Sequence, residues 1–171
     1  KNPRNSTWEK LQKKPVRLIA ALNHCGRMNF MVWGRLCWDS HPESLFPLPN
    51  ILHVVLSKTL DTVPDHAHFL CRDFDSAIRL AAEPPLADLI ETIWIVGGVQ
   101  VYKDALNHPW CDLLYLTDVM ADFDCDVFFP EFDKNLFQLQ EGFPGVPSEI
   151  QEENGIKFKY QVFKRDTADT V

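Results

Sequence analysis

The sequence predicts an α/β domain with an open, mostly parallel central sheet and an antiparallel strand pair at its C-terminal end. The first observation is the apolar run 93–96, which is typical of a short strand buried on both faces. Two glycines at 97–98 end the run, and apolar residues then recur with helical spacing at Val99, Tyr102 and Leu106. The second observation is that strand and helix patterns alternate along most of the chain, which favours a largely parallel sheet.

Length and composition predict one globular domain. The chain has 171 residues, of which 46% are hydrophobic and 24% are charged, an ordinary balance for a domain with a full core. The polar, basic stretch 1–15 is expected to form a tail, and the domain is expected at 16–165 with a second short tail at 166–171.

Charge and hydropathy exclude several partners. The formal net charge of −7 argues against nucleic acid as the main partner. The sequence has no apolar run long enough to cross a membrane and no secretory signal pattern, so we expect no membrane partner and a cytoplasmic location. The five cysteines are odd in number and form no CxxC pair, which is typical of reduced thiols.

The histidines give no indication of a metal site. The sequence contains no HExxH pattern and no His/Cys cluster with zinc-ligand spacing, so no metal is expected. His66 and His68 fit one face of a strand, where a surface pair is the preferred interpretation over a metal site.

In the first half of the chain, short apolar runs predict strands at 16–22, 30–33, 52–56 and 67–70. A helical turn is expected at 36–40 and an ordered, proline-rich loop at 42–50. Asp73 is a predicted N-cap, and a helix follows whose inner face is formed by Phe74, Ala77, Ile78 and Ala81.

In the second half, Pro84 and Pro85 end that helix, and a short helical segment near Ala87 leads into the central strand 93–96. After the next helix a strand is expected at 113–119. Alternating polar and apolar residues then predict exposed or edge strands at 137–140 and 157–163, with a turn at Asn154-Gly155.

The junction at Gly97-Gly98 is a candidate anion site, because the start of a helix offers free N–H groups and the positive end of its dipole. A residue without a Cβ also lets a phosphate approach the backbone. Two glycines after a strand are a weak signal, however, and a plain left-handed turn remains the alternative.

These residues resemble the animal type of dihydrofolate reductase over nearly the whole stretch from Pro15 to about Lys164. The matching segments are Ile19-Ala20-Ala21-Leu22, Gly34-Arg35 with Trp38, Ser40 with Pro42, Val55-Leu56-Ser57-Lys58, Trp94-Ile95-Val96-Gly97-Gly98, Val101-Tyr102, Asp126 with Phe128-Phe129-Pro130, and Gln151-Glu152-Glu153-Asn154-Gly155-Ile156-Lys157. The resemblance implies a three-layer α/β fold, a monomer, a small-molecule folate substrate and NADPH as the cofactor.

The resemblance also implies the site residues. Those implied for NADPH are Ala21, Gly34, Arg35, Cys37, Leu56, Ser57, Lys58, Arg72, Gly97, Gly98, Val99, Gln100 and Val101. The glycines would pass the pyrophosphate, and Ser57, Lys58 and Arg72 would lie near the 2′-phosphate, where a cation distinguishes NADPH from NADH. Those implied for the substrate and the nicotinamide end are Ala20, Ile95, Tyr102 and Thr117.

The chain departs from the family at several positions. A mobile loop and a helix bearing the acid that binds the pterin are absent, because Met28 is followed directly by the second strand. Ile51 replaces an Arg that holds the folate glutamate tail, Cys37 replaces a Thr and Leu36 replaces a basic residue. No catalytic residue is assigned; Glu9 is one candidate acid, against the interpretation of a solvated charge.

Two classes of function follow. The first is NADPH-dependent reduction of dihydrofolate to tetrahydrofolate, in one-carbon metabolism, impaired by the missing loop and acid-bearing helix. The second is a catalytically inactive dinucleotide-binding or interaction protein. A third, weaker hypothesis keeps the fold and reduces a different pterin or a pyrimidine.

Overall fold

The computed structural model of the protein describes residues 16–18 and 28–166. The predicted tail 1–15 lies outside the described residues, as does the predicted tail 166–171 apart from Asp166. The backbone N–H of Asp166 donates to the carbonyl oxygen of Leu136 at 2.8 Å. No helix in these two ranges is long and apolar enough to span a bilayer.

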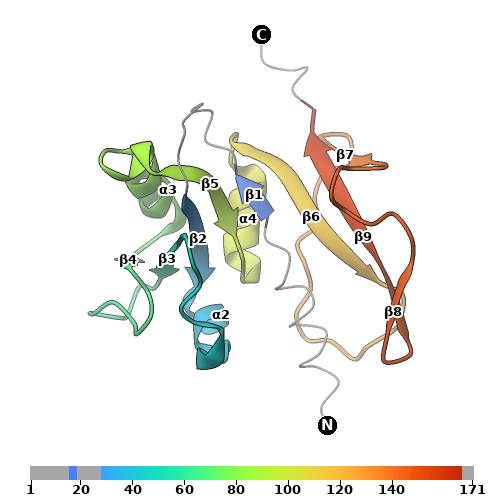
Figure 1. The fold of residues 1–171 in the computed structure, drawn as a ribbon, viewed down its shortest axis with the longest axis horizontal. Coiled ribbons are helices and arrows are strands. Elements are labelled where there is room, and N and C mark those ends of the chain that lie inside the picture. The colour runs from blue at the N-terminus through green and yellow to red at the C-terminus, as the bar shows by residue number, and fades with distance from the viewer. Residues whose placement is uncertain (1–15, 19–27, 167–171) are drawn as a thin grey trace.

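The described strands form one sheet in the order β4-β3-β2-β5-β1-β6-β9-β7, and β8 pairs with β9 beside this path (Figure 1). The strands are β1 (Val16–Leu18), β2 (Met28–Gly34), β3 (Ile51–Leu56), β4 (Phe69–Cys71), β5 (Ile90–Ile95), β6 (Cys111–Val119), β7 (Phe137–Gln140), β8 (Gln151–Glu153) and β9 (Ile156–Arg165). Because β5 lies between β2 and β1, the prediction of a central strand at 93–96 is confirmed.

The sheet has a parallel section and an antiparallel section. Strands β2, β3, β4 and β5 pair in parallel, whereas β9 pairs antiparallel with β6, β7 and β8. The predicted α/β class with a parallel centre and antiparallel C-terminal strands is therefore confirmed. The antiparallel section is wider than the predicted strand pair, because β1 also runs antiparallel to both β5 and β6.

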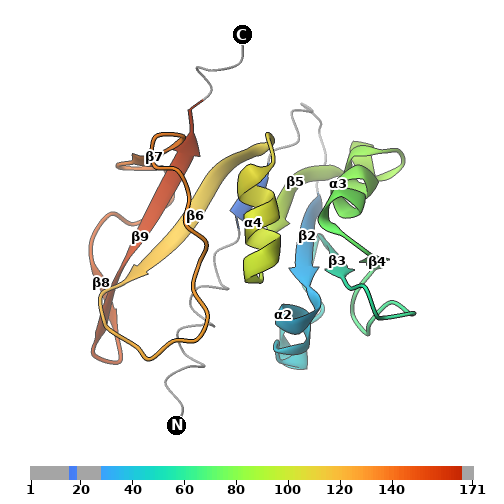
Figure 2. The ribbon, with the colours of Figure 1, turned by 180° about the vertical axis from the view of Figure 1, so that it is seen from behind.

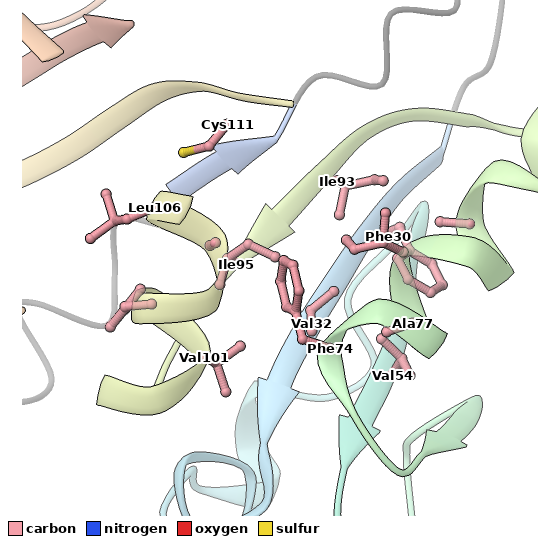
Figure 3. Packing of buried hydrophobic residues seen from close by; sticks show 14 of the residues in the cluster. Phe30, Val32, Val54, Phe74, Ala77, Ile93, Ile95, Val101, Leu106 and Cys111 are labelled. Carbon is pink, nitrogen blue, oxygen red and sulfur yellow. The ribbon is translucent and has the colours of Figure 1, made fainter. Parts of the chain in front are cut away.

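Helices α3 (Phe74–Ala82) and α4 (Val99–Asn107) lie over one face of this sheet (Figure 2). The strand residues beneath them alternate in sequence, and Phe30, Val32, Ile93 and Ile95 are each 0% exposed. Figure 3 shows these side chains meeting those of the two helices in the main hydrophobic core. The helix predicted after Asp73 is confirmed, including its cap, since the Asp73 side chain accepts the N–H of Ser76 at 2.8 Å.

The opposite face of the sheet carries a smaller core beside α2 (Arg35–Asp39), a short helix that confirms the turn predicted at 36–40. This core consists of Trp33, Cys37, Trp38, Val55 and Val96. Two short 3-10 helices, η1 (Glu43–Leu45) and η2 (Leu86–Asp88), lie within the predicted proline-rich loop and before β5 respectively.

One prediction near the C-terminal end of the domain is wrong. Residues 157–163 do not form an exposed or edge strand, because β9 has hydrogen-bonded neighbours on both sides. Alternating charge indicated that one face of the strand meets solvent, which says nothing about its edges. The first strand was predicted at 16–22, and β1 agrees with this prediction over Val16–Leu18, while residues 19–22 lie outside the described part.

Arg165, the last residue of β9, joins three separate elements. Its Nη2 donates to the carbonyl oxygens of Leu106 and His108 at 2.9 and 3.0 Å, and its Nε donates to that of Cys111 at 2.6 Å. These carbonyls belong to the C-terminal end of α4 and the start of β6, where a cation also complements the helix dipole. The guanidinium lies 4.7 Å from the centre of the Phe137 ring.

We expect Arg165→Met to lower the free energy of unfolding by about 2–3 kcal/mol, because three part-buried carbonyls lose a charged donor. Urea denaturation measures this loss. Lys164→Met is the matched control, because Lys164 is the exposed neighbour in the same strand and its replacement should change little. Equal effects of the two substitutions would contradict the assigned role of Arg165.

Candidate functional site

The centre of the candidate site is a turn of glycines where β5 ends and α4 begins. Gly97 has φ +110° and is joined to Gly98 by a cis peptide bond. The N–H of Gly34, at the end of β2, donates to the carbonyl oxygen of Gly97 at 2.6 Å. A Cβ added to Gly34 would lie 3.1 Å from the Gly98 nitrogen, so the two backbones pack directly on each other.

The first turn of α4 presents unpaired backbone donors at this place. Gly98 is the N-cap and makes no side-chain cap, and the N–H of Tyr102 bonds back to the Gly98 carbonyl at 2.9 Å. The N–H groups of Val99, Gln100 and Val101 precede that first intrahelical bond. Together with the positive end of the helix dipole, these donors form an arrangement that suits an anion such as a phosphate.

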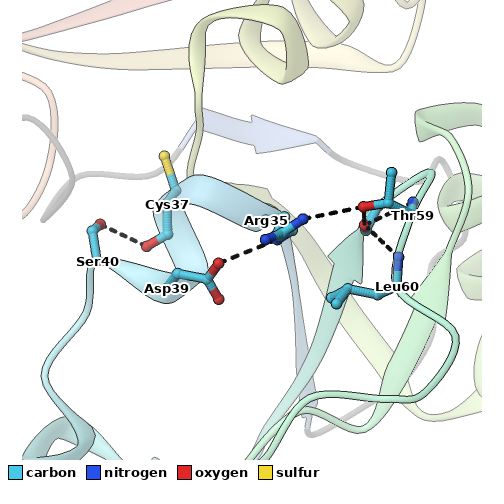
Figure 4. A network of polar contacts seen from close by, with 7 residues as sticks. Arg35, Cys37, Asp39, Ser40, Thr59 and Leu60 are labelled. Atoms are coloured by element: carbon cyan, nitrogen blue, oxygen red, sulfur yellow. Dashed lines mark hydrogen bonds and ion pairs between the residues drawn. The ribbon is translucent and has the colours of Figure 1, made fainter.

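Helix α2 adds a cation and a thiol beside the glycine turn. The Sγ of Cys37 is 3.3 and 3.4 Å from the positions that Cβ atoms on Gly97 and Gly98 would occupy. Arg35 lies at the start of α2, where its Nε contacts Asp39 at 3.3 Å and its Nη1 donates to Thr59 at 3.1 Å (Figure 4). Arg35 therefore connects α2 to the loop that follows β3.

Lys58 of that loop and Arg72, which follows β4, bring two further cations to the same edge. The Nη1 of Arg72 donates to the carbonyl oxygens of Ser57 and Leu60 at 3.2 and 2.5 Å. The Oγ of Ser57 accepts the N–H groups of Thr59 and Leu60 at 3.2 and 3.1 Å, which fixes the turn. Lys58 is exposed between these residues, whereas Leu56 packs against the main core.

The predicted cofactor residues thus form a band along the carboxyl ends of the parallel strands β2, β3 and β5. Ligands of open α/β sheets bind at this edge. Gly34 and Cys37 lie at the glycine turn, and Arg35 leads from it to Thr59, the residue after Lys58. Ala21 lies outside the described residues.

The predicted substrate residues are more scattered. Ile95 is 0% exposed in the main core, so its side chain is not available to a ligand, and its backbone is paired with Val32 of β2 and Val16 of β1. Tyr102 is 7% exposed and packs on Phe129 with the ring centroids 5.0 Å apart. Burial and the Cys37 thiol raise the pKa of Tyr102, so it remains a neutral phenol. Ala20 lies outside the described residues.

Thr117 is a buried polar residue whose hydroxyl has no partner among the residues that the structure describes. It lies on β6, which β1 separates from β5, and it is 7% exposed. Its Oγ1 makes no hydrogen bond within the described part of the chain. A buried hydroxyl without a partner has a cost in free energy, so this atom is suited to a polar group of a bound ligand.

Sequence reasoning missed Thr59 and Asp39, the two partners of Arg35. A signal existed for Asp39, because an Arg and an Asp four positions apart on a helix are neighbours. Thr59 gave no such signal, because its contact with Arg35 joins two elements. Within residues 28–166, His, Cys, Asp and Glu side chains form no group of three or more suited to a metal ion.

Comparison with known proteins agrees with this geometry. A family model described as "Dihydrofolate reductase" matches residues 13–165. The chain is 42% identical over 141 residues to a dihydrofolate reductase of Sus scrofa, covering 82% of this chain and 76% of that protein. It is 43% identical over 140 residues to a dihydrofolate reductase of Mus musculus, covering 82% and 75%.

A solved structure shows the same similarity in three dimensions. The dihydrofolate reductase of Schistosoma mansoni aligns with a TM-score of 0.74 and 28% sequence identity. The alignment covers 95% of this chain and 85% of that protein. The arrangement of strands and helices is therefore shared along nearly all of the sequence.

We expect Gly97→Ala to lower the free energy of unfolding by about 2–4 kcal/mol, from a strained backbone and close contacts. The new Cβ would lie 3.2 Å from the Tyr102 ring and 3.3 Å from the Cys37 Sγ. Gly142→Ala is the control, because Gly142 also has positive φ (+64°) but no atom within 4 Å of the added Cβ. Urea unfolding should show a smaller loss for the control, and equal losses would contradict the close packing at Gly97.

Proposed function

The chain belongs to the dihydrofolate reductase family, and on that premise we propose that it reduces dihydrofolate to tetrahydrofolate with NADPH, at a rate impaired by its departures from the family. The observation that carries this proposal is the glycine turn at the end of the central strand, backed by Gly34 and followed by the free N–H groups of α4. A turn without Cβ atoms at the start of a helix fits a pyrophosphate.

Different residues of the chain then bind different parts of NADPH. The amides of Val99 to Val101 bind the pyrophosphate, and the cations Lys58 and Arg72 bind the 2′-phosphate at the far end of the band. Arg35 is partly neutralised by Asp39, so it positions the loop at Thr59 as well as attracting phosphate. The cofactor supplies a hydride when bound, and the protein supplies its place and orientation.

Fewer polar groups are available for the substrate than for the cofactor. The free Oγ1 of Thr117 is available to hydrogen-bond the polar edge of a pterin, and Tyr102 is held neutral near the glycine turn. Hydride transfer to a pterin also needs a proton at its ring nitrogen, and we assign no acid to that task within residues 28–166. Impairment is therefore expected on the substrate side.

We propose a cytoplasmic monomer that acts on a small-molecule folate. The net charge of −7 supports a role without nucleic acid as the main partner. Size-exclusion chromatography with light scattering tests the oligomeric state, and a mass of twice 19.7 kDa would contradict it.

A specific observation favours a second function, that of a dinucleotide-binding protein without turnover. Only residues 19–27 connect β1 to β2, which is too short a segment for both a covering loop and an acid-bearing helix. The two functions differ in whether bound NADPH is oxidised when dihydrofolate is added.

An assay of NADPH oxidation with dihydrofolate decides between them. The chain is compared with a variant that carries the corresponding loop and helix of the Sus scrofa relative between Met28 and Asn29. Because general acids contribute about 10²–10⁴-fold, we expect the natural chain to have a kcat/KM at least about 100-fold lower than that variant. Equal kcat/KM values would show that the segment is dispensable or that another acid replaces it.

Lys58→Ala tests the cofactor side. Because a hydrogen bond to a charged group contributes about 1.5–3 kcal/mol, loss of the cation should weaken NADPH by about 10-fold or more. Binding of NADH, which lacks the 2′-phosphate, should be spared. Lys134→Ala is the matched control, because Lys134 is an exposed lysine in the loop before β7. Equal weakening of NADPH and NADH by Lys58→Ala would place the 2′-phosphate elsewhere.

A further inference from the structure

A corner of aromatic and histidine side chains lies beneath α2, on the face of the sheet opposite α3 and α4. Its centre is His53 of β3, whose residue is 1% exposed. The ring of His53 packs at centroid distances of 5.9 Å from Trp33, 5.3 Å from Trp38 and 5.2 Å from Phe46. Neither the glycine turn nor the cofactor band uses this histidine.

Two hydrogen bonds in this corner require neutral histidines. The indole N–H of Trp33 donates to the Nδ1 of His53 at 3.0 Å. The backbone N–H of His53 donates to the Nδ1 of His68, also at 3.0 Å. An imidazole nitrogen that accepts a hydrogen bond carries no proton, so protonating either ring at this nitrogen places two donors face to face.

The other ring nitrogen of His53, Nε2, also lies in surroundings that disfavour a positively charged imidazole. Its Nε2 is buried without a hydrogen-bond partner among the described residues. Burial, followed by the like charges of His68 and His41, lowers the pKa of His53 from 6.5 to about 4. His66 adds another imidazole, stacked on Phe46 with the ring centroids 5.7 Å apart.

The carboxylates on the surrounding elements do not offset these imidazoles. Asp39 of α2 pairs with Arg35 at 3.3 Å. Glu43 of η1 and Asp65, in the segment before β4, are exposed. The charges that act on His53 are those of His68 and His41, which oppose its protonation.

The same corner supports helix α2. Trp38 of α2 packs on His53 and, at 5.4 Å between ring centroids, on Trp33. The Nδ1 of His41 lies 2.9 Å from the carbonyl oxygen of Cys37, and since a carbonyl only accepts, His41 donates there. Because Cys37 touches the glycine turn, the corner holds α2 in place against it.

We propose that His53 and His68 form a proton-sensitive pair that holds α2 against the glycine turn, so that acid loosens α2 and weakens dinucleotide binding. The first part of this proposal depends only on the two hydrogen bonds and the burial of His53. The second part, the effect on dinucleotide binding, rests on the proposed function.

The direction of the effect follows from linkage. A base whose pKa is lowered in the closed state stabilises that state above its ordinary pKa, and this stabilisation is lost as the pH falls. For His53 the window runs from 6.5 down to about 4. Between pH 7.5 and pH 5 the equilibrium for opening the corner should therefore rise by about 30-fold.

Hydrogen exchange of indole protons tests the first part, and the chain contains an internal control. The indole N–H of Trp94 donates to Oδ1 of Asn29 at 2.9 Å, an acceptor that does not titrate. We expect the protection factor of the Trp33 indole proton to fall about 30-fold from pH 7.5 to pH 5, while that of Trp94 stays constant. Equal pH dependence at the two indoles would overturn the proposal.

Three variants make this test specific. His53→Asn keeps an oxygen at the position of Nδ1 without a titrating group, so Trp33 should lose its pH dependence. His68→Asn keeps an acceptor for the backbone N–H of His53 and removes one like charge that acts on His53, so it should reduce the pH dependence. This second variant keeps the test decisive where His53→Asn does not fold. His66→Asn should behave as the natural chain, because His66 accepts neither bond; a changed profile would overturn the assignment to His53 and His68.

Binding of NADP⁺, which is stable in acid, tests the second part. We expect the Kd of the natural chain to rise more between pH 7.5 and pH 5 than that of His53→Asn or His68→Asn. An equal rise in all of them would reflect the phosphate itself and would overturn the coupling to binding. If the chain binds no NADP⁺ at either pH, the proposed function fails, while the exchange measurement still decides the fate of the histidine pair.

Discussion

The structure depends on the close approach of two backbones at the ends of β2 and β5. The 2.6 Å hydrogen bond from Gly34 to Gly97 brings together the points where α2 and α4 begin. A side chain on Gly34 or Gly97 would meet backbone, the Tyr102 ring or the Cys37 thiol at 3.1–3.3 Å. Because this contact places both helices, the positions of the backbone donors at the start of α4 and of the cation on α2 depend on two residues that have no side chains.

The sequence predicted the elements whose signals are local. The apolar run before Gly97, the apolar run 30–33 in β2 and the cap at Asp73 each depend on neighbours in the chain, and all three agree with the structure. The strand β8 gave no local signal, because it consists of three polar residues that pair only when the turn at Asn154 and Gly155 folds back. The antiparallel position of β1 is likewise a property of the whole sheet.

The candidate site likewise has features that the sequence predicted and features that it did not. The glycine turn was predictable because Gly97 and Gly98 directly follow a buried apolar run, although these two residues alone left a plain left-handed turn as the alternative to an anion site. The contact of Arg35 with Thr59 and the histidine corner were not, because each joins residues that are far apart in sequence. His53 belongs to the alternation of an ordinary buried strand, and only the surrounding rings reveal a buried imidazole without a partner for Nε2.

The two faces of the sheet contribute unequally to the stability of the described part of the chain. The main core lies between the sheet and helices α3 and α4, and it includes residues such as Phe30, Ile93 and Leu114 that are 0% exposed. The opposite face has the smaller core beside α2, and Trp94 and Tyr115 on that side are only half-buried, with their rings 6.0 Å apart. Most of the hydrophobic stabilisation therefore comes from the face that the departures from the family leave intact. Changes on the opposite face should therefore affect the support of α2 before they affect the fold, because the smaller core there is the one that packs beside this helix.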